Sequence, residues 1–131
     1  MVDITVRTSQ HTQFLKIDSE VQRAVEAAGV REGLVHLFVP HTTAGITINE
    51  NADPDVVSDM ARILEKAFPW GGEYAHAEGN SAAHVKASMM GFSLTVPVCD
   101  GRLAFGTWQS IYFCEFDGPR QRSVRVCVTK A

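Results

Sequence analysis

The chain has 131 residues, of which 45% are hydrophobic and 21% are charged, and its formal net charge is −3. This length suits a single domain over residues 1–131, and the apolar content is too high for a disordered chain. The acidic balance argues against a nucleic-acid partner, and no segment reaches the roughly 18 to 20 apolar residues that cross a bilayer, which argues against a membrane protein.

The first 40 residues alternate between strand and helix patterns. Residues 3–9 alternate apolar and polar side chains, which predicts a strand, and residues 10–18 are expected to be its hairpin partner. Residues 19–29 change to helical spacing, capped at the start by Asp18 or Ser19 and ended by a glycine. Residues 33–40 are apolar and β-branched, which predicts a buried strand.

The middle of the chain contains the clearest helix. Residues 41–50 mix β-branched and polar residues and predict a loop that enters a strand. Residues 53–68 have apolar positions at helical spacing, with Asp53 as the cap and Pro54 at the first helical position. A shorter helix is predicted over residues 81–91, capped by Asn80 or Ser81.

The C-terminal third has a period of two, as strands do. Residues 92–98 place four apolar side chains on one face, and the Asp-Gly pair within 99–102 predicts a hairpin turn. Residues 103–116 predict one long or two broken strands, and residues 122–130 a final strand. We therefore expect an α+β fold that is β-rich, with about three helices and an antiparallel C-terminal meander.

The cysteines and the N-terminus indicate a cellular compartment. Cys99, Cys114 and Cys127 are odd in number, far apart in sequence and without a C-x-x-C motif. We expect reduced, mostly buried thiols. The N-terminus has neither a basic region nor an apolar stretch of the kind that a signal peptide needs, so we expect a cytoplasmic protein.

The segment HAEGNSAAH, which begins at His76, gathers residue types that bind metals and move protons. In an extended segment His76, Glu78 and Asn80 project to one side, and His84 follows Asn80 at the spacing that stacks side chains on a helix. His41 opens the loop after a buried strand and is a candidate third imidazole. The segment therefore predicts a metal or catalytic site, provided that the chain bends near Asn80.

A purely structural interpretation of these residues stays open. Asn80 fits a helix cap and Glu78 fits a solvated carboxylate, and H-x-E-x-N-x-x-x-H is not an established zinc signature. His11 and His36 are expected to be hydrogen-bonded or exposed residues in a turn and a strand.

A second group of polar residues lies in the last third. Arg102, Arg120 and Arg122 are forked donors that suit phosphate, although hairpin turns and sheet edges also carry such arginines. Trp108 alternates in step with the aromatic residues that follow it, so both a ligand contact and a core position are open.

Four runs of sequence resemble a known family. They are HTTAGITINENADPDV (41–56), HAEGNSAAHVKASMMG (76–91), VPVCDGRLAFGTWQSIYFCEFDGPR (96–120) and the closing RSVRVCV. Together they cover most of residues 35 to 128, in the order found in the YjbQ family of small bacterial and archaeal proteins, and the chain resembles that family.

The resemblance implies a jelly-roll-like sandwich that assembles as a homotrimer. It also implies a secondary thiamine-phosphate synthase activity, which joins a pyrimidine methyl diphosphate to a thiazole phosphate and releases pyrophosphate. The residues that it places in a shared pocket are His41, Glu50, His76, Glu78, Asn80, His84, Arg102, Trp108, Gln109, Glu115 and Arg120.

Three functions follow as hypotheses. The first is the synthase, with a divalent metal ion (zinc or magnesium), catalytic roles for Glu50, Glu78 and His84, and substrate contacts from Asn80, Arg102, Trp108, Gln109, Glu115 and Arg120. The second is a metal-dependent hydrolase or metal-binding protein that uses His41, His76 and His84. The third is a non-catalytic binder of a small anionic metabolite. Because the polar motifs fall on three separate loops, we also expect the pocket to lie where subunits meet.

Overall fold

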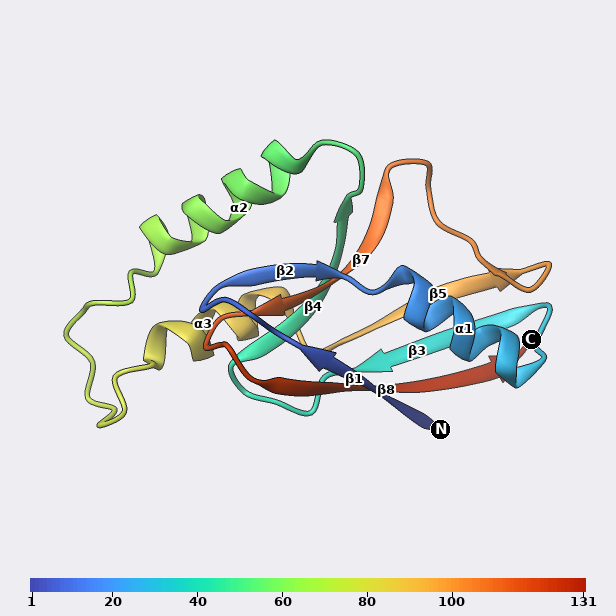
Figure 1. Cartoon of the computed structure of the whole chain (residues 1–131), viewed down its shortest axis with the longest axis horizontal. Coiled ribbons are helices and arrows are strands. Elements are labelled where there is room, and N and C mark those ends of the chain that lie inside the picture. The colour runs from blue at the N-terminus through green and yellow to red at the C-terminus, as the bar shows by residue number, and fades with distance from the viewer.

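The computed structural model describes all 131 residues, which form two antiparallel sheets and three helices (Figure 1). The strands are β1 (Val2–Arg7), β2 (Gln13–Lys16), β3 (Gly33–Phe38), β4 (Ala44–Glu50), β5 (Ser93–Cys99), β6 (Arg102–Leu103), β7 (Gln109–Glu115) and β8 (Gln121–Lys130). The helices are α1 (Asp18–Ala28), α2 (Pro54–Ala67) and α3 (Ser81–Met90).

The larger sheet has five strands in the order β1-β8-β3-β5-β6. Its central strand β3 alternates strictly, with Val35 and Leu37 buried in the core and Leu34, His36 and Phe38 on the outer face. This is the pattern of a sheet with one packed face and one face toward solvent. His36 is thus an exposed strand residue, as predicted, and its Nδ1 lies 3.0 Å from Thr95 Oγ1 on β5.

The smaller sheet has three strands in the order β2-β7-β4, and its central strand β7 is covered on both faces. Ile111 and Phe113 point into the main core between the sheets. Tyr112 and Cys114 point the other way, into a second cluster beneath α3. Burial on both sides explains why the sequence of β7 is almost continuously apolar.

Helix α1 packs Val21 and Val25 into the main core and ends at Gly29, whose φ of 68° is the left-handed conformation that glycine adopts easily. Asp18 does not cap this helix as predicted, and the position before the helix is Ile17. The Asp18 carboxylate instead accepts hydrogen bonds from Ser110 Oγ (2.6 Å) and the Ile111 N–H (2.7 Å), so it fastens α1 to β7.

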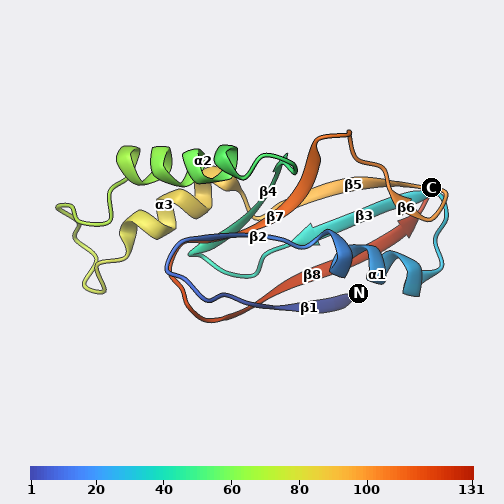
Figure 2. The same cartoon turned by 45° about the horizontal axis from the view of Figure 1, so that its top comes forward.

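Helix α2 begins as its sequence predicts, with Pro54 in the first turn and the Asp53 carboxylate accepting from the Asp55 N–H (2.9 Å). It has no fully buried residue, and it stands above the smaller sheet at one end of the molecule (Figures 1 and 2). The buried ammonium of Lys86 on α3 pairs with Glu65 on α2 at 2.7 Å, so an ion pair helps to fix the two helices together.

Helix α3 lies directly against β4, where Gly45 permits a close approach. A Cβ atom at residue 45 would lie 2.7 Å from the Gly91 carbonyl oxygen. That carbonyl accepts a hydrogen bond from the Ile46 N–H at 3.0 Å, which joins the end of α3 to the strand. Asn80 precedes α3, as predicted, but its side chain makes no capping hydrogen bond.

Two strand pairings differ from the sequence prediction. β1 and β2 are not a hairpin, because β1 pairs with β8 and β2 pairs with β7 in the other sheet. Thr8 lies between β1 and β2, where the chain passes from one sheet to the other. It is buried and hydrogen-bonded to Glu115 and to the Arg120 backbone. These partners lie more than 100 residues away, out of reach of a local pattern.

The prediction of a C-terminal antiparallel meander is also only partly correct. β5 and β6 form the predicted hairpin at Asp100-Gly101, where both residues have positive φ (52° and 76°), as the Asp-Gly signal requires. After β6, however, β7 moves to the smaller sheet and β8 returns to the larger one. The architecture is nevertheless the expected α+β, β-rich, antiparallel single domain.

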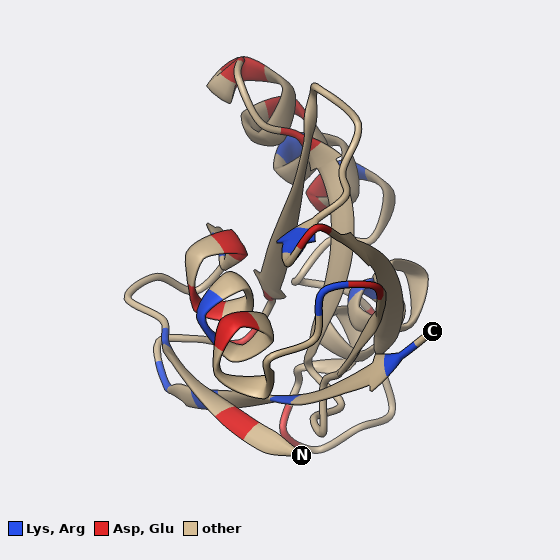
Figure 3. Ribbon diagram, turned by 90° about the vertical axis from the view of Figure 1, so that its right-hand side faces the viewer, with Lys and Arg blue, Asp and Glu red and all other residues tan.

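The cysteines are less uniformly buried than predicted, because Cys114 is buried, Cys127 is intermediate and Cys99 is exposed. Burial raises the pKa of the Cys114 thiol. Basic and acidic residues are interspersed along the ribbon (Figure 3). None of the three helices combines the length and the apolar character that a membrane span requires.

Candidate functional site

The three histidines predicted to form a site, His41, His76 and His84, lie in one polar cleft of about 480 Å³, which we call the histidine cleft. Apart from Pro40, every residue that lines it has a polar side chain. The lining consists of Pro40, His41, Thr42, Thr43, His76, Glu78, Asn80, His84, Asp117, Arg120 and Arg122. The loop after β3, the segment leading into α3 and the turn between β7 and β8 all contribute, so the chain does bend near Asn80 as the motif required.

A buried ion pair forms the base of the cleft. Glu115 is fully buried and Arg122 is 4% exposed. Arg122 donates to both carboxylate oxygens of Glu115, from Nε at 2.9 Å and from Nη2, and it also donates from Nη2 to Thr43 Oγ1 at 2.8 Å. This two-pronged arrangement is the strong form of an arginine–carboxylate contact, and it fixes the Arg122 side chain.

Glu115 receives further hydrogen bonds from Thr8 Oγ1 (2.8 Å) and from the N–H groups of Phe116 and Asp117 (3.1 Å each). Burial alone would raise the pKa of Glu115, but the hydrogen bonds from Arg122, Asp117 and Thr8 outweigh burial and lower it. Glu115 is therefore a charged group buried beneath the cleft, and its hydrogen bonds fix the Arg122 side chain.

His41 is held in one tautomer. The Ser123 N–H donates to its Nε2 at 3.0 Å, so Nε2 is unprotonated and the neutral ring carries its proton on Nδ1. Burial and the neighbouring Arg122 guanidinium lower the pKa of His41. His41 thus presents a neutral N–H donor near pH 7.

His76 and His84 form a close pair at the other wall. Their ring centroids are 5.7 Å apart, with the rings nearly perpendicular at 89°. His84 is half-buried on α3, whereas His76 and Glu78 are exposed on the segment before it. Two imidazoles and a carboxylate are groups that can accept or donate a proton to a ligand in the cleft.

Asn80, Asp117 and Arg120 form a connected set between these walls. Asn80 Nδ2 donates to Asp117 Oδ2 at 2.9 Å, and Arg120 contacts the same carboxylate oxygen at 3.2 Å. Asn80 is 7% exposed, and its Oδ1 is buried without a hydrogen-bond donor. A buried acceptor without a donor is costly.

The charges in the cleft nearly cancel. Arg122 is paired with Glu115 and Arg120 with Asp117, while Glu78 adds a further carboxylate. The cleft therefore offers many directional donors but little surplus positive charge. A ligand with several negative charges would need to bring a counter-ion with it.

The residues fit a metal ion only in part. No three His, Cys, Asp or Glu side chains are arranged as a set of metal ligands. The predicted third ligand, His41, uses Nε2 to accept the Ser123 N–H, which leaves only the protonated Nδ1. His76 and His84 are close enough to act together, but the three-histidine centre expected from the sequence is not assembled.

Three other predicted site residues lie at the far end of the smaller sheet. Glu50 pairs with Gln109 at one end of the β4–β7 ladder, and Ala44 pairs with Glu115 at the other. Six strand residues span about 20 Å, so Glu50 and Gln109 are that far from the base of the cleft. Trp108, next to Gln109, is 64% exposed.

These far residues have local roles. Glu50 Oε2 accepts from the Ala52 N–H at 2.9 Å, and Gln109 Oε1 accepts from the Gly106 N–H at 2.8 Å. Arg102 is also outside the cleft, at the β5–β6 turn beside Arg31 and Asp100. Of the eleven predicted pocket residues, six line the cleft, namely His41, His76, Glu78, Asn80, His84 and Arg120. Glu115 is buried beneath it, and Glu50, Arg102, Trp108 and Gln109 lie outside it.

Asp117 and Thr43 line the cleft but carry no sequence motif that predicts a site role. Asp117 sits in the DGPR turn, where an aspartate is expected for conformational reasons, and Thr43 is one of two adjacent threonines. Asp117 lies three residues before Arg120, and Thr43 lies two residues after His41. These spacings are only a weak indication that the residues belong to a site. Only the fold shows that their side chains bind the two arginines of the cleft.

The chain is similar to curated proteins over most of its length. It is 50% identical over 121 residues to UPF0047 protein YugU of Bacillus subtilis, which covers 92% of each chain. It is 44% identical over 121 residues to a UPF0047 protein of Methanocaldococcus jannaschii, covering 92% of this chain and 88% of the relative.

Solved structures agree with this similarity. An uncharacterized conserved protein of the yjbq/upf0047 family from Clostridium acetobutylicum superposes with a TM-score of 0.96 at 52% identity, covering 98% of this chain and all of that one. A hypothetical protein of Aeropyrum pernix K1 superposes with a TM-score of 0.93 at 35% identity, covering 99% and 98%. The family described as UPF0047 protein YjbQ-like matches residues 2–131, and the chain belongs to that family.

Proposed function

We propose that the histidine cleft binds the phosphate group of a small metabolite and supplies acid–base groups beside it. The observation that carries this proposal is the composition of the cleft, where three histidines and two arginines converge on one volume of about 480 Å³. Pockets for apolar ligands are lined mainly by hydrophobic and aromatic side chains, and those are almost absent here. The polar lining favours a ligand that is itself polar.

The donors have distinct tasks. Arg120 is half-exposed, so its guanidinium can turn toward a phosphate oxygen while its Nε stays bonded to the Asp117 carbonyl at 2.9 Å. The Nδ1–H of neutral His41 is a second donor. His84 and His76 stand on the opposite wall, where either ring can transfer a proton to or from the bound molecule.

The named reaction of this proposal is the thiamine-phosphate synthase type. The C–O bond to the diphosphate breaks, the thiazole nitrogen forms the new C–N bond, and pyrophosphate leaves with its electron pair. Because the cleft has little surplus positive charge, the diphosphate would enter as its Mg²⁺ complex, the form in which such phosphates commonly bind. Hydrogen bonds from Arg120 and His41 would then stabilise the departing group.

The test is formation of thiamine phosphate from the two purified substrates with Mg²⁺, detected by mass spectrometry. Arg120→Ala should lower the rate at least tenfold, because it removes a charged donor from the cleft. Arg102→Ala is the matched control, since Arg102 lies outside the cleft, and should leave the rate unchanged. A wild-type rate equal to the enzyme-free blank would refute the synthase. Tight binding without turnover would favour the non-catalytic binder of an anionic metabolite.

A metal-binding function is the second candidate, favoured by the 5.7 Å spacing of the His76 and His84 rings. Glu78 is the nearby carboxylate on the same segment. Elemental analysis of untagged protein tests it, with His76→Ala as the variant and His36→Ala as the control. Near-stoichiometric zinc, manganese or iron that is lost only in His76→Ala would support this function. Less than about a tenth of an equivalent in the wild type would exclude a tightly held metal.

We further propose that the protein acts as a homotrimer with its clefts at subunit interfaces. Two features support this. Helix α2 has no fully buried residue despite its apolar stripe, and Ile63 on it is 66% exposed. Trp108 is an exposed aromatic residue on a loop at the far end of the smaller sheet. Contact with another copy would cover both and would place polar groups from two chains near one another.

A further inference from the structure

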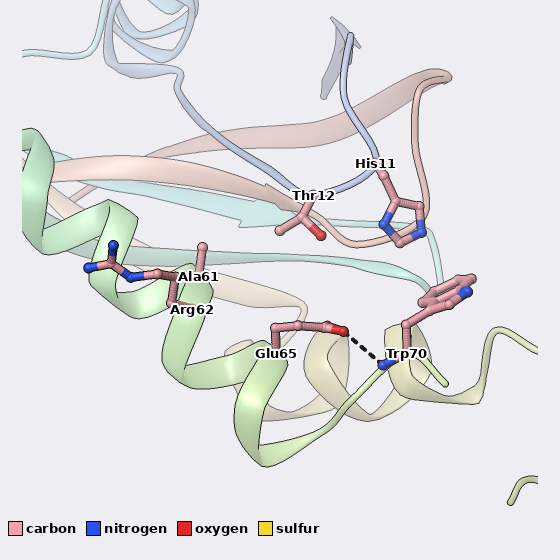
Figure 4. A pocket seen from close by; sticks show the side chains of 6 residues that line it. All are labelled: His11, Thr12, Ala61, Arg62, Glu65 and Trp70. Carbon is pink, nitrogen blue, oxygen red and sulfur yellow. Dashed lines mark hydrogen bonds between the residues drawn. The ribbon is translucent and has the colours of Figure 1, made fainter. Parts of the chain in front are cut away.

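A larger cavity lies on the other side of Asp117 from the histidine cleft. It has a volume of about 590 Å³ and is lined by His11, Thr12, Ala61, Arg62, Glu65 and Trp70 (Figure 4). We call it the tryptophan cleft. His11 Nε2 is 3.9 Å from Asp117 Oδ1, and Asp117 also lines the histidine cleft. The two cavities are therefore neighbours but share no lining residue, and the proposed function makes no use of this one.

Aromatic rings form one corner of the tryptophan cleft. The rings of His11 and Trp70 are perpendicular (89°), with centroids 4.3 Å apart. Trp70 is half-buried, and its position is fixed because its backbone N–H donates to Glu65 Oε1 at 2.8 Å. Figure 4 shows both rings and the Glu65 carboxylate around the same opening. A wall of this kind offers π-surface to a flat ligand ring.

The buried Lys86 ammonium keeps the Glu65 carboxylate charged and fixes its position. Lys86 Nζ donates to Glu65 Oε2 at 2.7 Å, and the Lys86 side chain is only 3% exposed. This hydrogen bond lowers the pKa of Glu65. The Glu65 side chain itself is 50% exposed. Since a carboxylate has about four lone-pair positions and two are used, Glu65 can still accept hydrogen bonds from a ligand.

The other lining residues limit the size of the ligand. Ala61 is a small side chain on α2, one turn before Glu65, and leaves room above the helix. Thr12 and Arg62 add a hydroxyl and a guanidinium, and Arg62 is already paired with Asp59. The volume lies within the range of small-molecule sites, roughly 300 to 1,000 Å³.

We propose that the tryptophan cleft is a second ligand site, which binds a small flat aromatic ring carrying an amine. The ring packs against Trp70, and the amine donates to Glu65. An ammonium group gains additionally from the face of the indole. This site is independent of the phosphate chemistry in the histidine cleft, so either proposal can fail without the other.

The chain has two tryptophans, Trp70 and Trp108, so a Trp108→Phe background makes Trp70 the single tryptophan reporter. Benzylamine is the probe, and benzyl alcohol is the uncharged molecule of the same shape. We expect the fluorescence emission of Trp70 to change saturably as benzylamine is added. The dissociation constant should be about 1 mM, which is typical of a fragment of this size. Benzyl alcohol should bind about tenfold more weakly, because it lacks the charge-assisted hydrogen bond.

Two variants locate the site. Ala61→Leu fills the cleft from α2 without disturbing the Lys86–Glu65 pair and should abolish binding. Glu65→Gln should remove the preference for the amine, provided that circular dichroism shows an intact fold. Equal binding of the amine and the alcohol, unchanged binding in Ala61→Leu, or no saturable response at about 10 mM would each overturn the proposal. So would shielding of Trp70 from acrylamide, since a second copy would then cover the cleft.

Discussion

At the scale of single residues, the histidine cleft depends on a buried ion pair at its base. Glu115 and Arg122 are buried together and satisfy each other, and Thr8 and Thr43 complete their hydrogen bonds. Such a pair is weak evidence for stability as a whole, but removing one member leaves a buried charge without a partner. The pair therefore serves to hold Asp117 and the β7–β8 turn in the position that shapes the cleft.

Replacing Glu115 by glutamine should destabilise the protein by about 3 kcal/mol, because Arg122 would remain buried and charged. Urea denaturation monitored by circular dichroism measures the change. Asp100→Asn is the control, since it breaks the exposed Arg31–Asp100 pair and should change stability by less than about 1 kcal/mol. Equal effects of the two substitutions would contradict the role assigned to Glu115.

The lowered pKa of His41 predicts that the stability of the protein depends on pH. Its pKa in the folded protein is lowered, so between the folded value and the unfolded value of about 6.5 the unfolded chain binds more protons. The stabilising contribution is complete above about pH 6.5 and decreases as the pH falls below that value. The slope of unfolding free energy against pH just below 6.5 should shrink in His41→Gln. An unchanged slope in His41→Gln would contradict the role assigned to His41.

At the scale of elements, local sequence patterns predicted the helices better than the sheets. Helix α2 begins at its Asp53-Pro54 signal and α1 ends at Gly29, because caps and glycine stops act within a few residues. The predicted hairpin was wrong, because β1 pairs with β8 and β2 with β7, and Thr8 between them is hydrogen-bonded to Glu115, 107 residues away. No periodicity within residues 3–18 contains that information.

Gly45 is a strong test of how α3 is positioned. In Gly45→Ala the new Cβ would lie 2.7 Å from the Gly91 carbonyl oxygen, a backbone atom that cannot rotate away. We expect a loss of roughly 2 kcal/mol, typical of overpacking, and displacement of His84, which α3 carries. Gly71→Ala is the matched control because nothing lies within 4 Å of its added Cβ. Equal melting temperatures for the two variants would show that β4 and α3 are not in close contact.

The ion pair between Glu65 on α2 and Lys86 on α3 predicts unequal losses of stability, depending on which partner is replaced. Glu65→Ala leaves the Lys86 ammonium buried without its partner and should cost about 2 kcal/mol, whereas Lys86→Met removes the buried charge and should change stability by less than about 1 kcal/mol. Guanidinium denaturation of both variants gives the comparison. A larger loss in Lys86→Met than in Glu65→Ala would mean that the lysine acts through contacts other than Glu65.

At the scale of the whole molecule, the site was predictable as a set of residue types but not as a set of positions. His76, Asn80 and His84 are close in sequence, and spacing sufficed to bring them together. Arg120 and Arg102 look alike in sequence, and only the crossing of β7 between sheets places Arg120 in the cleft and Arg102 at a remote turn. Glu50 and Gln109 are likewise separated from the histidines by the length of β4.

If the protein forms the proposed homotrimer, light scattering across a size-exclusion peak should give a mass of three chains. Neighbouring copies would then cover exposed apolar positions such as Ile63 and Trp108. Ile63→Glu on α2 should reduce the trimer fraction, because it places a charge where apolar contact is expected. Lys66→Glu on the same helix is a control for charge alone. A wild-type mass of one chain at micromolar concentration would refute the trimer.

We propose that a phosphorylated metabolite binds in the histidine cleft. Isothermal titration of thiazole phosphate into the wild type, Arg120→Ala and Arg102→Ala measures this binding. We expect equal affinity for the wild type and Arg102→Ala, and at least tenfold weaker binding for Arg120→Ala, which loses a charged donor worth about 1.5 to 3 kcal/mol. Binding that survives in Arg120→Ala and is lost in Arg102→Ala would place the site at the β5–β6 turn and contradict the claim.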